Sequence, residues 1–442
     1  EDLPVDVRFM LPSCVPATPL DESGANLDYR AIDSFYDHPR VQGLAEMMNF
    51  VGTINGDPQV VEKIVASQAH HKKIDGHAPD LVGNDLNAYI AAGVYSDHEC
   101  HDLNDAIAKL QRGQFIMIRE GTAARNLEAL VPLLCDKYVE RCMFCTDDKH
   151  PNDLLEKGHI DYIVKKAISL GADPITAIKA ACHNAARYFL LNNRGAIAPG
   201  YLADFVIIDD FDHFNIEKVY KRGVLMVDHG VVADFPVPEI DPYLVNRAHD
   251  TFHVAPLTAA DFTDSRPHAV IGMVNGEITT TDGGYTDRID VDYDILKIAV
   301  IERHKNTHHI GLGYIKGYGL KHGAVATSIS HDSHNIIACG VSPEDIAFAV
   351  NELKKMHGGI IVVENGQIQA RLPLEVAGLF TDRPLPEVNE KLEHCKAAAW
   401  AQGVNRGIDP FMTLSFASLP VIPALRLTTK GVFNVNTLTF VE

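Results

Sequence analysis

The sequence predicts an α/β protein with a (β/α)₈-type TIM barrel, followed by a small β-domain and a C-terminal α+β domain. Strands and helices alternate from Val5 to Leu190, which indicates a parallel sheet with right-handed crossovers. Short apolar runs bounded by polar turns are typical of strands that are buried on both faces. Four of the six expected strands end in a residue that can bind a metal, and a barrel gathers such ends at one mouth.

Each expected strand of the barrel is an apolar run that stops at a polar residue. The strands span Val5–Leu11, Val41–Glu46, Ile74–His77, Tyr95–Glu99, Gln114–Arg119 and Arg141–Thr146. Apolar residues at helical spacing predict the helices that alternate with them. These span Pro58–Gln68, Leu86–Ala92, Leu103–Arg112, Asn126–Cys135, Ile160–Ile168 and Pro174–Tyr188. Because a closed barrel of this type has eight strands, we expect a further element, before Glu1 or elsewhere, to complete it.

The rest of the chain changes character after the predicted barrel at residues 1–194. Short strands with glycine turns predict the small β-domain over residues 195–240, and Pro236–Pro242 contains the linker that follows it. Residues 246–442 make up the predicted α+β domain. Ser342 caps a helix that begins at Pro343. The other expected elements are the strands Ala269–Gly276, Ile298–Glu302 and Ile360–Asn365 and the helix Val388–Trp400.

Composition limits the partners and the compartment of the protein. The 442 residues carry a net charge of −20, which argues against nucleic acid and anionic membranes and favours an uncharged or cationic small molecule. No apolar run is long enough to cross a bilayer. The eight cysteines lack the spacing of a disulfide framework, which suits the cytoplasm. Cys142 and Cys145 would point to opposite faces of a strand, so we expect no zinc or redox role for them.

Two carboxylates and two imidazoles lie at the ends of expected strands: Glu46, His77, His98 and Asp147. This donor set suits Zn²⁺, Mn²⁺ or Fe²⁺. Taken singly, each residue has an ordinary structural explanation, because a turn histidine, an ion pair with a sequence neighbour or a capping carboxylate would occur at the same place. Their common position at strand ends of one barrel favours a shared metal site.

Five motifs resemble the bacterial-type adenine deaminases, a branch of the amidohydrolase superfamily of metal-dependent hydrolases. They are GLAEMMN (Gly43–Asn49), IDGHAP (Ile74–Pro79), SDHE (Ser96–Glu99), MIREGTAARN (Met117–Asn126) and FCTDDKHP (Phe144–Pro151). The resemblance continues through GAIAPGYLADFVIID, ISHDSHNIIACG and DPFMTLSFASLPVIP, so it covers essentially the whole chain. It implies a barrel of the amidohydrolase kind in which the six expected strands are the third to the eighth.

The resemblance also implies a binuclear site for manganese or iron, with zinc as an alternative. Glu46 would be the carboxylate that the two ions share, and His77, His98 and Asp147 would be further ligands. The family's His-x-His pair on the first strand has no counterpart in this sequence. We therefore expect this chain alone to bind metal more weakly, because even changes around a ligand typically cost about 10–100-fold.

The reaction that the resemblance implies is the hydrolytic deamination of adenine to hypoxanthine and ammonia, in purine salvage. Paired divalent ions would lower the pKa of a bound water toward about 7 and so supply a hydroxide. Asp147 would carry the proton of that hydroxide to the leaving amine. Glu120 is the candidate donor of a proton to the purine ring. Arg119 would orient the ring or pair with a carboxylate, unless Arg119 and Glu120 form only a surface ion pair.

Two segments of the last domain have less specific signals. His331, Asp332 and His334 interrupt an apolar stretch. They form either a polar turn between strands or, as the resemblance implies, a loop that reaches the metal site or closes over the purine. Gly311–Gly319 (GLGYIKGYG) lacks the Lys-Ser/Thr pair of a phosphate loop, so we expect a flexible turn there.

Two other functions stay open from the sequence. The same hydroxide could hydrolyse a cyclic amide or an N-acyl substrate, and the loops that face the substrate would decide between these reactions. A truncated homologue that folds with a partner would have no activity of its own. For the deaminase, the resemblance implies a cytoplasmic homo-oligomer, a dimer, that acts on a small molecule.

Overall fold

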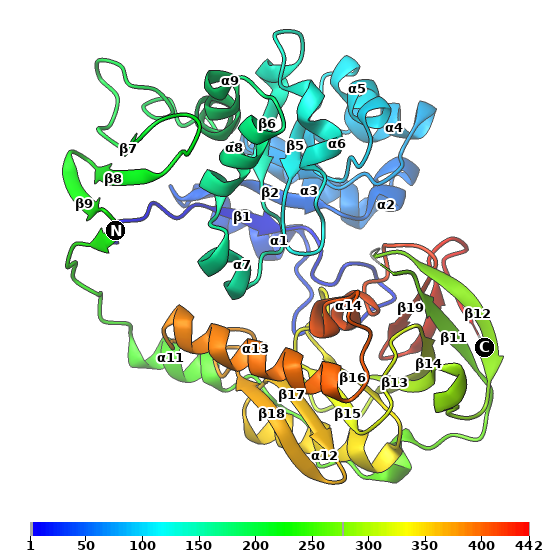
Figure 1. Ribbon diagram of the computed structural model, residues 1–442. Coiled ribbons are helices and arrows are strands. Elements are labelled where there is room, and N and C mark those ends of the chain that lie inside the picture. The colour runs from blue at the N-terminus through cyan, green and yellow to red at the C-terminus, as the bar shows by residue number, and fades with distance from the viewer. Residues whose placement is uncertain (1–2, 276–277, 442) are drawn as a thin grey trace. The chain divides into compact units, whose positions relative to one another are not determined.

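The computed structural model describes residues 3–275 and 278–441, and the chain forms two compact units (Figure 1). Unit 1 comprises Glu1–Ser13 and Leu27–Glu239, and unit 2 comprises Cys14–Asn26 and Ile240–Glu442. All eight cysteines are free thiols. Within the described residues, no helix combines the length and the apolar character that a membrane span needs.

Unit 1 contains the six parallel strands that the sequence predicts. They are β1 (Phe9–Pro12), β2 (Val41–Met47), β3 (Lys73–Gly76), β4 (Ser96–Asp97), β5 (Phe115–Arg119) and β6 (Cys142–Cys145). Two parallel sheets have the orders β1-β2-β3 and β4-β5-β6. The Tyr95 N–H donates to the Ile74 carbonyl at 2.9 Å and so connects β3 to β4 across the seam between the sheets.

The helices of unit 1 alternate with these strands, as predicted (Figure 1). They are α1 (Tyr29–Asp33), α2 (Phe50–Asn55), α3 (Pro58–Ala69), α4 (Gly83–Ala91), α5 (Leu103–Gln111), α6 (Leu127–Leu130), α7 (Pro151–Glu156), α8 (Ile160–Ser169), α9 (Pro174–Lys179) and α10 (Ala185–Tyr188). A π-helical segment, Ala180–Asn184, joins α9 to α10. Helix α3 packs on β2 and β3, α5 packs on β5, and α8 packs on β6. This is the arrangement that strand–helix alternation requires.

Helix α6 is shorter than the helix predicted over Asn126–Cys135. It ends at Leu130 and is followed by a 3₁₀ turn, Val131–Leu133. Pro132 has no N–H to donate and its ring clashes with the preceding turn, so the α-helix stops there.

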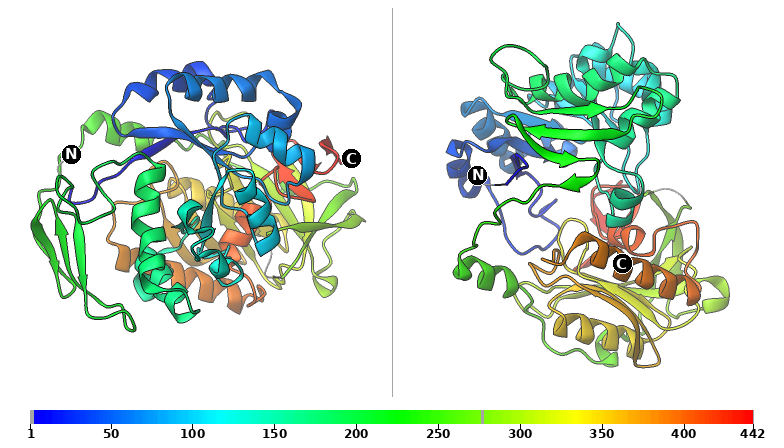
Figure 2. Two further views of the ribbon diagram at one scale, coloured as in Figure 1. Left: turned by 90° about the horizontal axis from the view of Figure 1, so that it is seen from above. Right: turned by 60° about the vertical axis from the view of Figure 1, so that its left-hand side comes forward.

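A four-stranded antiparallel sheet follows the parallel strands within unit 1 (Figure 2). Its strands are β7 (Phe205–Ile208), β8 (Ile216–Lys221), β9 (Val224–Asp228) and β10 (Val231–Val232). All of their residues are exposed or half-buried. Residues 236–241 have no regular structure, and α11 (Pro242–His249) begins at the last residue of the predicted linker.

Unit 2 is built on an eight-stranded sheet of order β12-β11-β14-β13-β16-β15-β17-β18. Alternate residues of β13 belong to different cores: Ile298 and Val300 pack with α13, and Ala299 and Ile301 pack with α12. The two helices therefore cover opposite faces of the sheet, and Figure 1 shows them on either side of it. A smaller sheet of three strands, β19-β20-β21, completes the unit.

The bounds of the elements in unit 2 agree with most of the predictions. The strands are β11 (His268–Met273), β12 (Thr280–Thr286), β13 (Ile295–Ile301), β14 (Ile310–Lys316), β15 (Ala324–Thr327), β16 (Ile336–Gly340), β17 (Gly359–Glu364), β18 (Gln367–Pro373), β19 (Leu425–Thr428), β20 (Gly431–Asn434) and β21 (Thr439–Phe440). The helices that follow α11 are α12 (Pro343–Lys355), α13 (Leu385–Ala401) and α14 (Pro410–Phe416). Ser342 caps α12 as predicted. Gly276, the predicted end of a strand, lies outside the described residues.

The flexible turn expected over Gly311–Gly319 is wrong for its first half. Gly311 and Gly313 lie inside β14, which pairs with β13 and β11. A Cβ on Gly311 would lie 1.8 Å from the Thr428 carbonyl oxygen of β19, so this strand needs glycine to let the smaller sheet approach. Gly317 and Gly319, with φ of 95° and 91°, form the turn after the strand.

Candidate metal centre

Three of the four residues predicted at strand ends lie together in unit 1. Glu46 is the penultimate residue of β2, and His77 and His98 directly follow β3 and β4. One potential ligand atom from each of the three lies within 4.8 Å of the other two. Asp147, two residues beyond β6, forms an overlapping group with His98 and Glu99 within the same distance. Parallel strands bring these ends to one edge of the sheets, as strand–helix alternation predicts.

The two imidazoles face the same two carboxylates. Glu46 Oε2 lies 3.1 Å from His77 Nδ1 and 3.0 Å from His98 Nε2. Glu99 Oε1 lies 3.5 Å from the same His77 nitrogen and 3.2 Å from the same His98 nitrogen. The side chains of His77 and Glu99 are buried, but Glu46 and Asp147 keep 30% and 32% of their side-chain surface exposed. Solvent therefore reaches the cluster on the side of these two carboxylates.

Glu99 is a further member of the cluster, and its contact with His98 is the pairing with a sequence neighbour that the sequence left open. In a continuous strand its side chain would point away from that of His98. The strand ends at Asp97 instead, because Asp97 Oδ2 accepts a hydrogen bond from the Glu99 N–H at 3.1 Å. This also makes β4 shorter than the predicted Tyr95–Glu99. Two features of the sequence could have indicated this position of Glu99. It directly follows the expected ligand His98, and Asp97 before them could end the strand.

Arg119, the last residue of β5, connects Glu99 to Asp147. Its Nη1 pairs with Glu99 Oε1 and lies 2.8 Å from Asp147 Oδ2, and its Nη2 donates to Glu99 Oε2 at 3.3 Å. Its Nε donates to Asn126 Oδ1 at 3.2 Å. The guanidinium is buried, so the surface ion pair between Arg119 and Glu120 is wrong. Pairing with carboxylates, one of the two roles expected of Arg119, is what the structure shows.

Glu120 makes a different contact. Its Oε1 lies 2.6 Å from Lys166 Nζ of α8, as expected for a residue next to Arg119 whose side chain takes the opposite direction. Its Oε2 is buried and has no hydrogen-bond partner among the described residues. The role of Glu120 as a proton donor to the purine stays a prediction.

Charge interactions dominate the ionisation of the cluster. Burial alone would raise the pKa of Glu46, but the His98 and His77 imidazoles hold that pKa well below its usual range. Burial is likewise outweighed at Glu99, whose pKa the imidazoles and Arg119 lower. The same pairs raise the pKa values of His77 and, more strongly, His98, against the effect of burial. A cation that binds here replaces protons on the imidazoles, so its affinity falls at low pH.

The Tyr89 hydroxyl connects the strand ends that carry Glu46 and His77. Tyr89 lies on α4 and is fully buried. Its hydroxyl donates to the Met47 carbonyl at 2.8 Å and accepts from the His77 N–H at 2.9 Å. Because Met47 follows Glu46 directly, one side chain sets the separation of β2 and β3 where the ligands emerge.

A buried ion pair fixes the backbone on both sides of the histidines. Lys109 Nζ lies 3.0 Å from Asp97 Oδ2 and 2.9 Å from Asp105 Oδ2, and it donates to the Ala78 carbonyl at 2.8 Å. Asp97 Oδ1 accepts from the Ala78 N–H at 2.8 Å. Asp97, Cys100 and Asp105 form another group of potential metal ligands. The Lys109 ammonium lies against both carboxylates of that group and supplies the positive charge they require.

The loop that carries Asp147 packs tightly on the loop after β5. Asp147 has a φ of 54°, a left-handed conformation that aspartate tolerates better than most residues. A Cβ on Gly121 would lie 2.2 Å from the Thr146 carbonyl oxygen, so glycine is required at this crossing. The Thr122 N–H donates to the Asp148 carbonyl at 2.9 Å. These contacts hold the Asp147 carboxylate beside Arg119.

His331, Asp332 and His334 lie in unit 2, in the loop between β15 and β16. The His331 ring stacks on Phe416 with centroids 4.8 Å apart, and its Nδ1 lies 2.6 Å from Asp332 Oδ1. The Arg303 guanidinium donates to the His334 carbonyl. The segment therefore has the position of a turn between strands, and its contact with a substrate stays a prediction.

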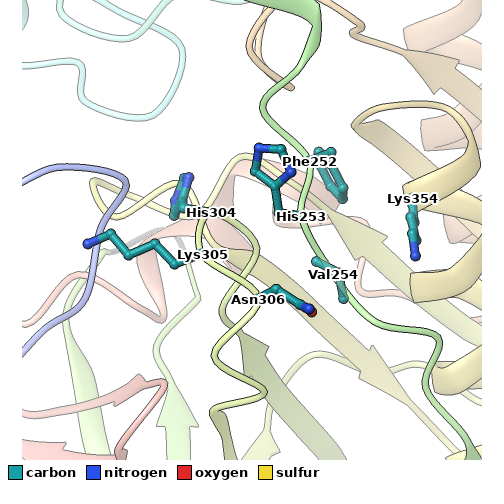
Figure 3. A pocket seen from close by; sticks show the side chains of 7 residues that line it. All are labelled: Phe252, His253, Val254, His304, Lys305, Asn306 and Lys354. Carbon is teal, nitrogen blue, oxygen red and sulfur yellow. The ribbon is translucent and has the colours of Figure 1, made fainter.

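Unit 2 also contains a pocket of about 490 Å³ (Figure 3). It is lined by Phe252, His253, Val254, His304, Lys305, Asn306 and Lys354. In Figure 3 the two lysines come from opposite sides of the pocket. This set of side chains lacks a carboxylate, so it does not suit a hard divalent cation. The donor set at the ends of β2, β3 and β4 does, because it combines imidazole nitrogens with ionised carboxylates at contact distance.

Comparison with known proteins adds independent findings. Residues 1–226 match the Amidohydrolase family, and residues 272–439 match the Adenine deaminase C-terminal domain. An adenine deaminase of Nitratidesulfovibrio vulgaris (strain DP4) is 44% identical over 99% of this chain and 77% of its own length. One from Desulfatibacillum aliphaticivorans is 44% identical over 100% of this chain and 78% of its own length. One from Dehalococcoides mccartyi (strain 195) is 45% identical over 98% of this chain and 77% of its own length.

Proposed function

This chain belongs to the amidohydrolase family, in the branch of the adenine deaminases, and we propose that it catalyses the hydrolytic deamination of adenine. Adenine and water give hypoxanthine and ammonia. The observation that carries this proposal is the cluster of Glu46, His77 and His98, with Asp147 beside it, in a chain whose relatives at 44% identity are adenine deaminases. A metal-dependent hydrolase needs such a donor set at the ends of its strands.

Membership of the amidohydrolase family implies a divalent metal. The residues that would hold it are Glu46, His77, His98 and Asp147. We propose manganese or iron, in a binuclear arrangement, and the nitrogen and oxygen donors suit zinc as well. When bound, the metal supplies the nucleophile, because it lowers the pKa of a coordinated water from about 15.7 toward about 7.

Asp147 is the proposed proton carrier. It accepts a proton from the attacking water and gives a proton to the amine as the bond from C6 to nitrogen breaks. Both of its oxygens are oriented: Oδ2 faces Arg119 Nη1 at 2.8 Å, and Oδ1 accepts from the Asp148 N–H at 2.8 Å. Its partly exposed side chain keeps it accessible to a substrate.

The remaining residues bind and orient the purine in this proposal. Arg119 and Glu120 lie at the end of β5, and Glu120 would donate the proton that the ring nitrogen gains. His331, Asp332 and His334, in the loop after β15, stay proposed as substrate-binding residues. A cytoplasmic location and a homodimer are part of the same proposal, and eight free thiols suit a reducing compartment.

Ammonia release from adenine, adenosine and cytosine, with Mn²⁺ or Fe²⁺ added to the 442-residue chain, tests the function. We expect release from adenine with hypoxanthine as the product, and loss of it in Asp147→Asn. Release from a cyclic amide or N-acyl substrate but not from adenine would point to another amidohydrolase reaction. A metal-loaded protein that converts none of these compounds contradicts the proposal.

A further inference from the structure

We propose that Glu99 is a fourth ligand of one of the divalent ions, beside Glu46, His77 and His98. The proposal rests on the proposed function only in that both require a metal at this site. It adds a carboxylate that the family motif does not assign and makes the end of β4 supply two ligands, His98 and Glu99.

The four separations between the imidazole nitrogens and the carboxylate oxygens lie within about 0.3 Å of those that ligands of one ion require. A divalent ion with four ligands at about 2.0–2.2 Å in a tetrahedron requires donor atoms about 3.3–3.6 Å apart. Two of the four separations between imidazole nitrogens and carboxylate oxygens are 3.0 and 3.1 Å, at Glu46 Oε2. The other two are 3.2 and 3.5 Å, at Glu99 Oε1. Glu99 is therefore placed like Glu46 with respect to both histidines.

The charges point the same way. Glu46 and Glu99 together carry two negative charges, which match one divalent cation. Both carboxylates lie at contact distance from the two imidazoles, and Glu99 also pairs with Arg119. The side chain of Glu99 is buried, and a buried carboxylate needs either a cation or several donors.

Arg119 orients Glu99 without blocking it. The guanidinium holds both Glu99 oxygens, with Nη1 on Oε1 and Nη2 on Oε2 at 3.3 Å. A carboxylate oxygen has two lone pairs, so Oε1 can accept from Arg119 and still face the imidazoles. Carboxylates that bind metals are commonly held by such an outer hydrogen bond. The alternative is that Glu99 only positions Arg119 and Asp147.

Metal titration separates a ligand from a positioning residue. We compare the full chain with Glu99→Gln, Arg119→Met and, as a control, Glu128→Gln, an exposed carboxylate on α6. Affinity for Zn²⁺ is measured by competition with a chelator, and Co²⁺ absorption in the visible range reports the ligand set. We expect Glu99→Gln to lower Zn²⁺ affinity by at least about 10-fold and to change the Co²⁺ spectrum. Arg119→Met, which keeps the carboxylate, should lower affinity less, and Glu128→Gln should change neither quantity.

Retained affinity and an unchanged Co²⁺ spectrum in a folded Glu99→Gln protein would overturn the assignment, even if activity were lost. If this variant does not fold, a crystal structure of the Zn²⁺-loaded unsubstituted chain decides. Glu99 Oε1 within about 2.2 Å of the ion supports the proposal, and a separation above about 3 Å overturns it.

These measurements need no adenine, so they are independent of the proposed function. Metal binding that depends on Glu99, in a chain that releases no ammonia from adenine, refutes the function alone. Ammonia release with metal binding that is independent of Glu99 refutes the fourth ligand alone. An unsubstituted chain that binds no divalent metal overturns the fourth ligand whatever the ammonia assay shows.

Discussion

Tyr89 holds two ligand-bearing strand ends through one oxygen atom. Replacing it by Phe removes that oxygen with almost no change in shape and leaves the His77 N–H without its acceptor. Because outer hydrogen bonds typically contribute about 10–100-fold to metal affinity, we expect Tyr89→Phe to weaken Zn²⁺ binding by about 10-fold. The free energy of unfolding should fall by about 1–3 kcal/mol.

Chelator competition and urea unfolding measure the two effects of Tyr89→Phe. Tyr285→Phe, at an exposed position of β12, is the matched control and should alter neither quantity. A Tyr89→Phe protein with unchanged metal affinity would show that β2 and β3 keep their spacing without the hydroxyl.

The buried carboxyl group of Asp21 makes the stability of unit 2 depend on pH. Burial raises the pKa of its carboxyl from 3.8 to about 7, and the hydrogen bond from the Glu22 N–H offsets this only in part. The folded chain thus keeps a proton that the unfolded chain has released. This contribution to stability is fully present below about pH 3.8 and is lost as the pH rises through about 7. We expect Asp21→Asn to remove this decline of the free energy of unfolding with rising pH. The effect should reach up to about 4 kcal/mol at pH 7.

Urea unfolding of both proteins across about pH 4–8 measures that difference. The exposed Asp382→Asn serves as the control and should leave the pH profile as it is. Identical profiles for the original chain and Asp21→Asn would mean that Asp21 is ionised in the folded state.

At the scale of single residues, the sequence predicts the position of a side chain best when a single structural rule determines it. Glu46, His77, His98 and Asp147 could be predicted because parallel strands bring their ends together. The approach of Glu99 to His77 could not, because the direction of the Glu99 side chain depends on the Asp97 side chain, which ends β4 one residue before His98. The sequence also did not identify which carboxylate pairs with Arg119. Glu99 lies twenty residues earlier and becomes a neighbour of Arg119 only in the folded sheet.

At the scale of elements, strands with local patterns were predictable and β14 was not. Its glycines resemble a turn, but they serve a contact with Thr428, which is more than a hundred residues away. We expect Gly311→Ala to lower the free energy of unfolding by more than about 3 kcal/mol, because the added Cβ would lie 1.8 Å from a backbone oxygen that cannot move freely.

Gly366→Ala is the comparison for Gly311→Ala. Gly366 has a φ of 67° and open space around its Cβ position, so its substitution costs only the left-handed backbone, about 1–2 kcal/mol. Denaturant unfolding followed by tryptophan fluorescence measures both, since Trp400 belongs to unit 2. Equal losses in the two variants would contradict the close approach of β14 and β19.

At the scale of the whole molecule, metal binding should stabilise one unit selectively. All residues of the candidate centre belong to unit 1. Zn²⁺ at about 100 times its dissociation constant contributes about 2.7 kcal/mol to the state that binds it. Hydrogen exchange should therefore slow at the ends of β2, β3 and β4 and stay unchanged in β13 to β16. The same measurement in Glu46→Gln is the control, and protection that rises only in unit 2 would contradict the site.

The sequence predicts the alternating strands and helices of unit 1 in more detail than the contacts between residues that are far apart in the chain. Six strands and most helices follow from local periodicity. The membership of Cys14–Asn26 in unit 2 does not, because its contacts join residues about three hundred positions apart. His309 Nδ1 lies 2.9 Å from Glu22 Oε1, and the Asn335 amide donates to the Glu22 carbonyl at 2.8 Å. No local pattern encodes either partner.

The same segment affects how the chain can be made. Residues 14–26 leave the ribosome long before their partners, because His309 and Asn335, which contact Glu22, are translated more than two hundred residues later. At about 5–20 residues per second, this segment waits for tens of seconds before its partners exist. If the gene were split after residue 239, the first polypeptide would carry residues 14–26 without their partners in unit 2. The second polypeptide would contain the rest of unit 2 without residues 14–26. Co-expression of the two fragments is then the route by which unit 2 would regain Glu22.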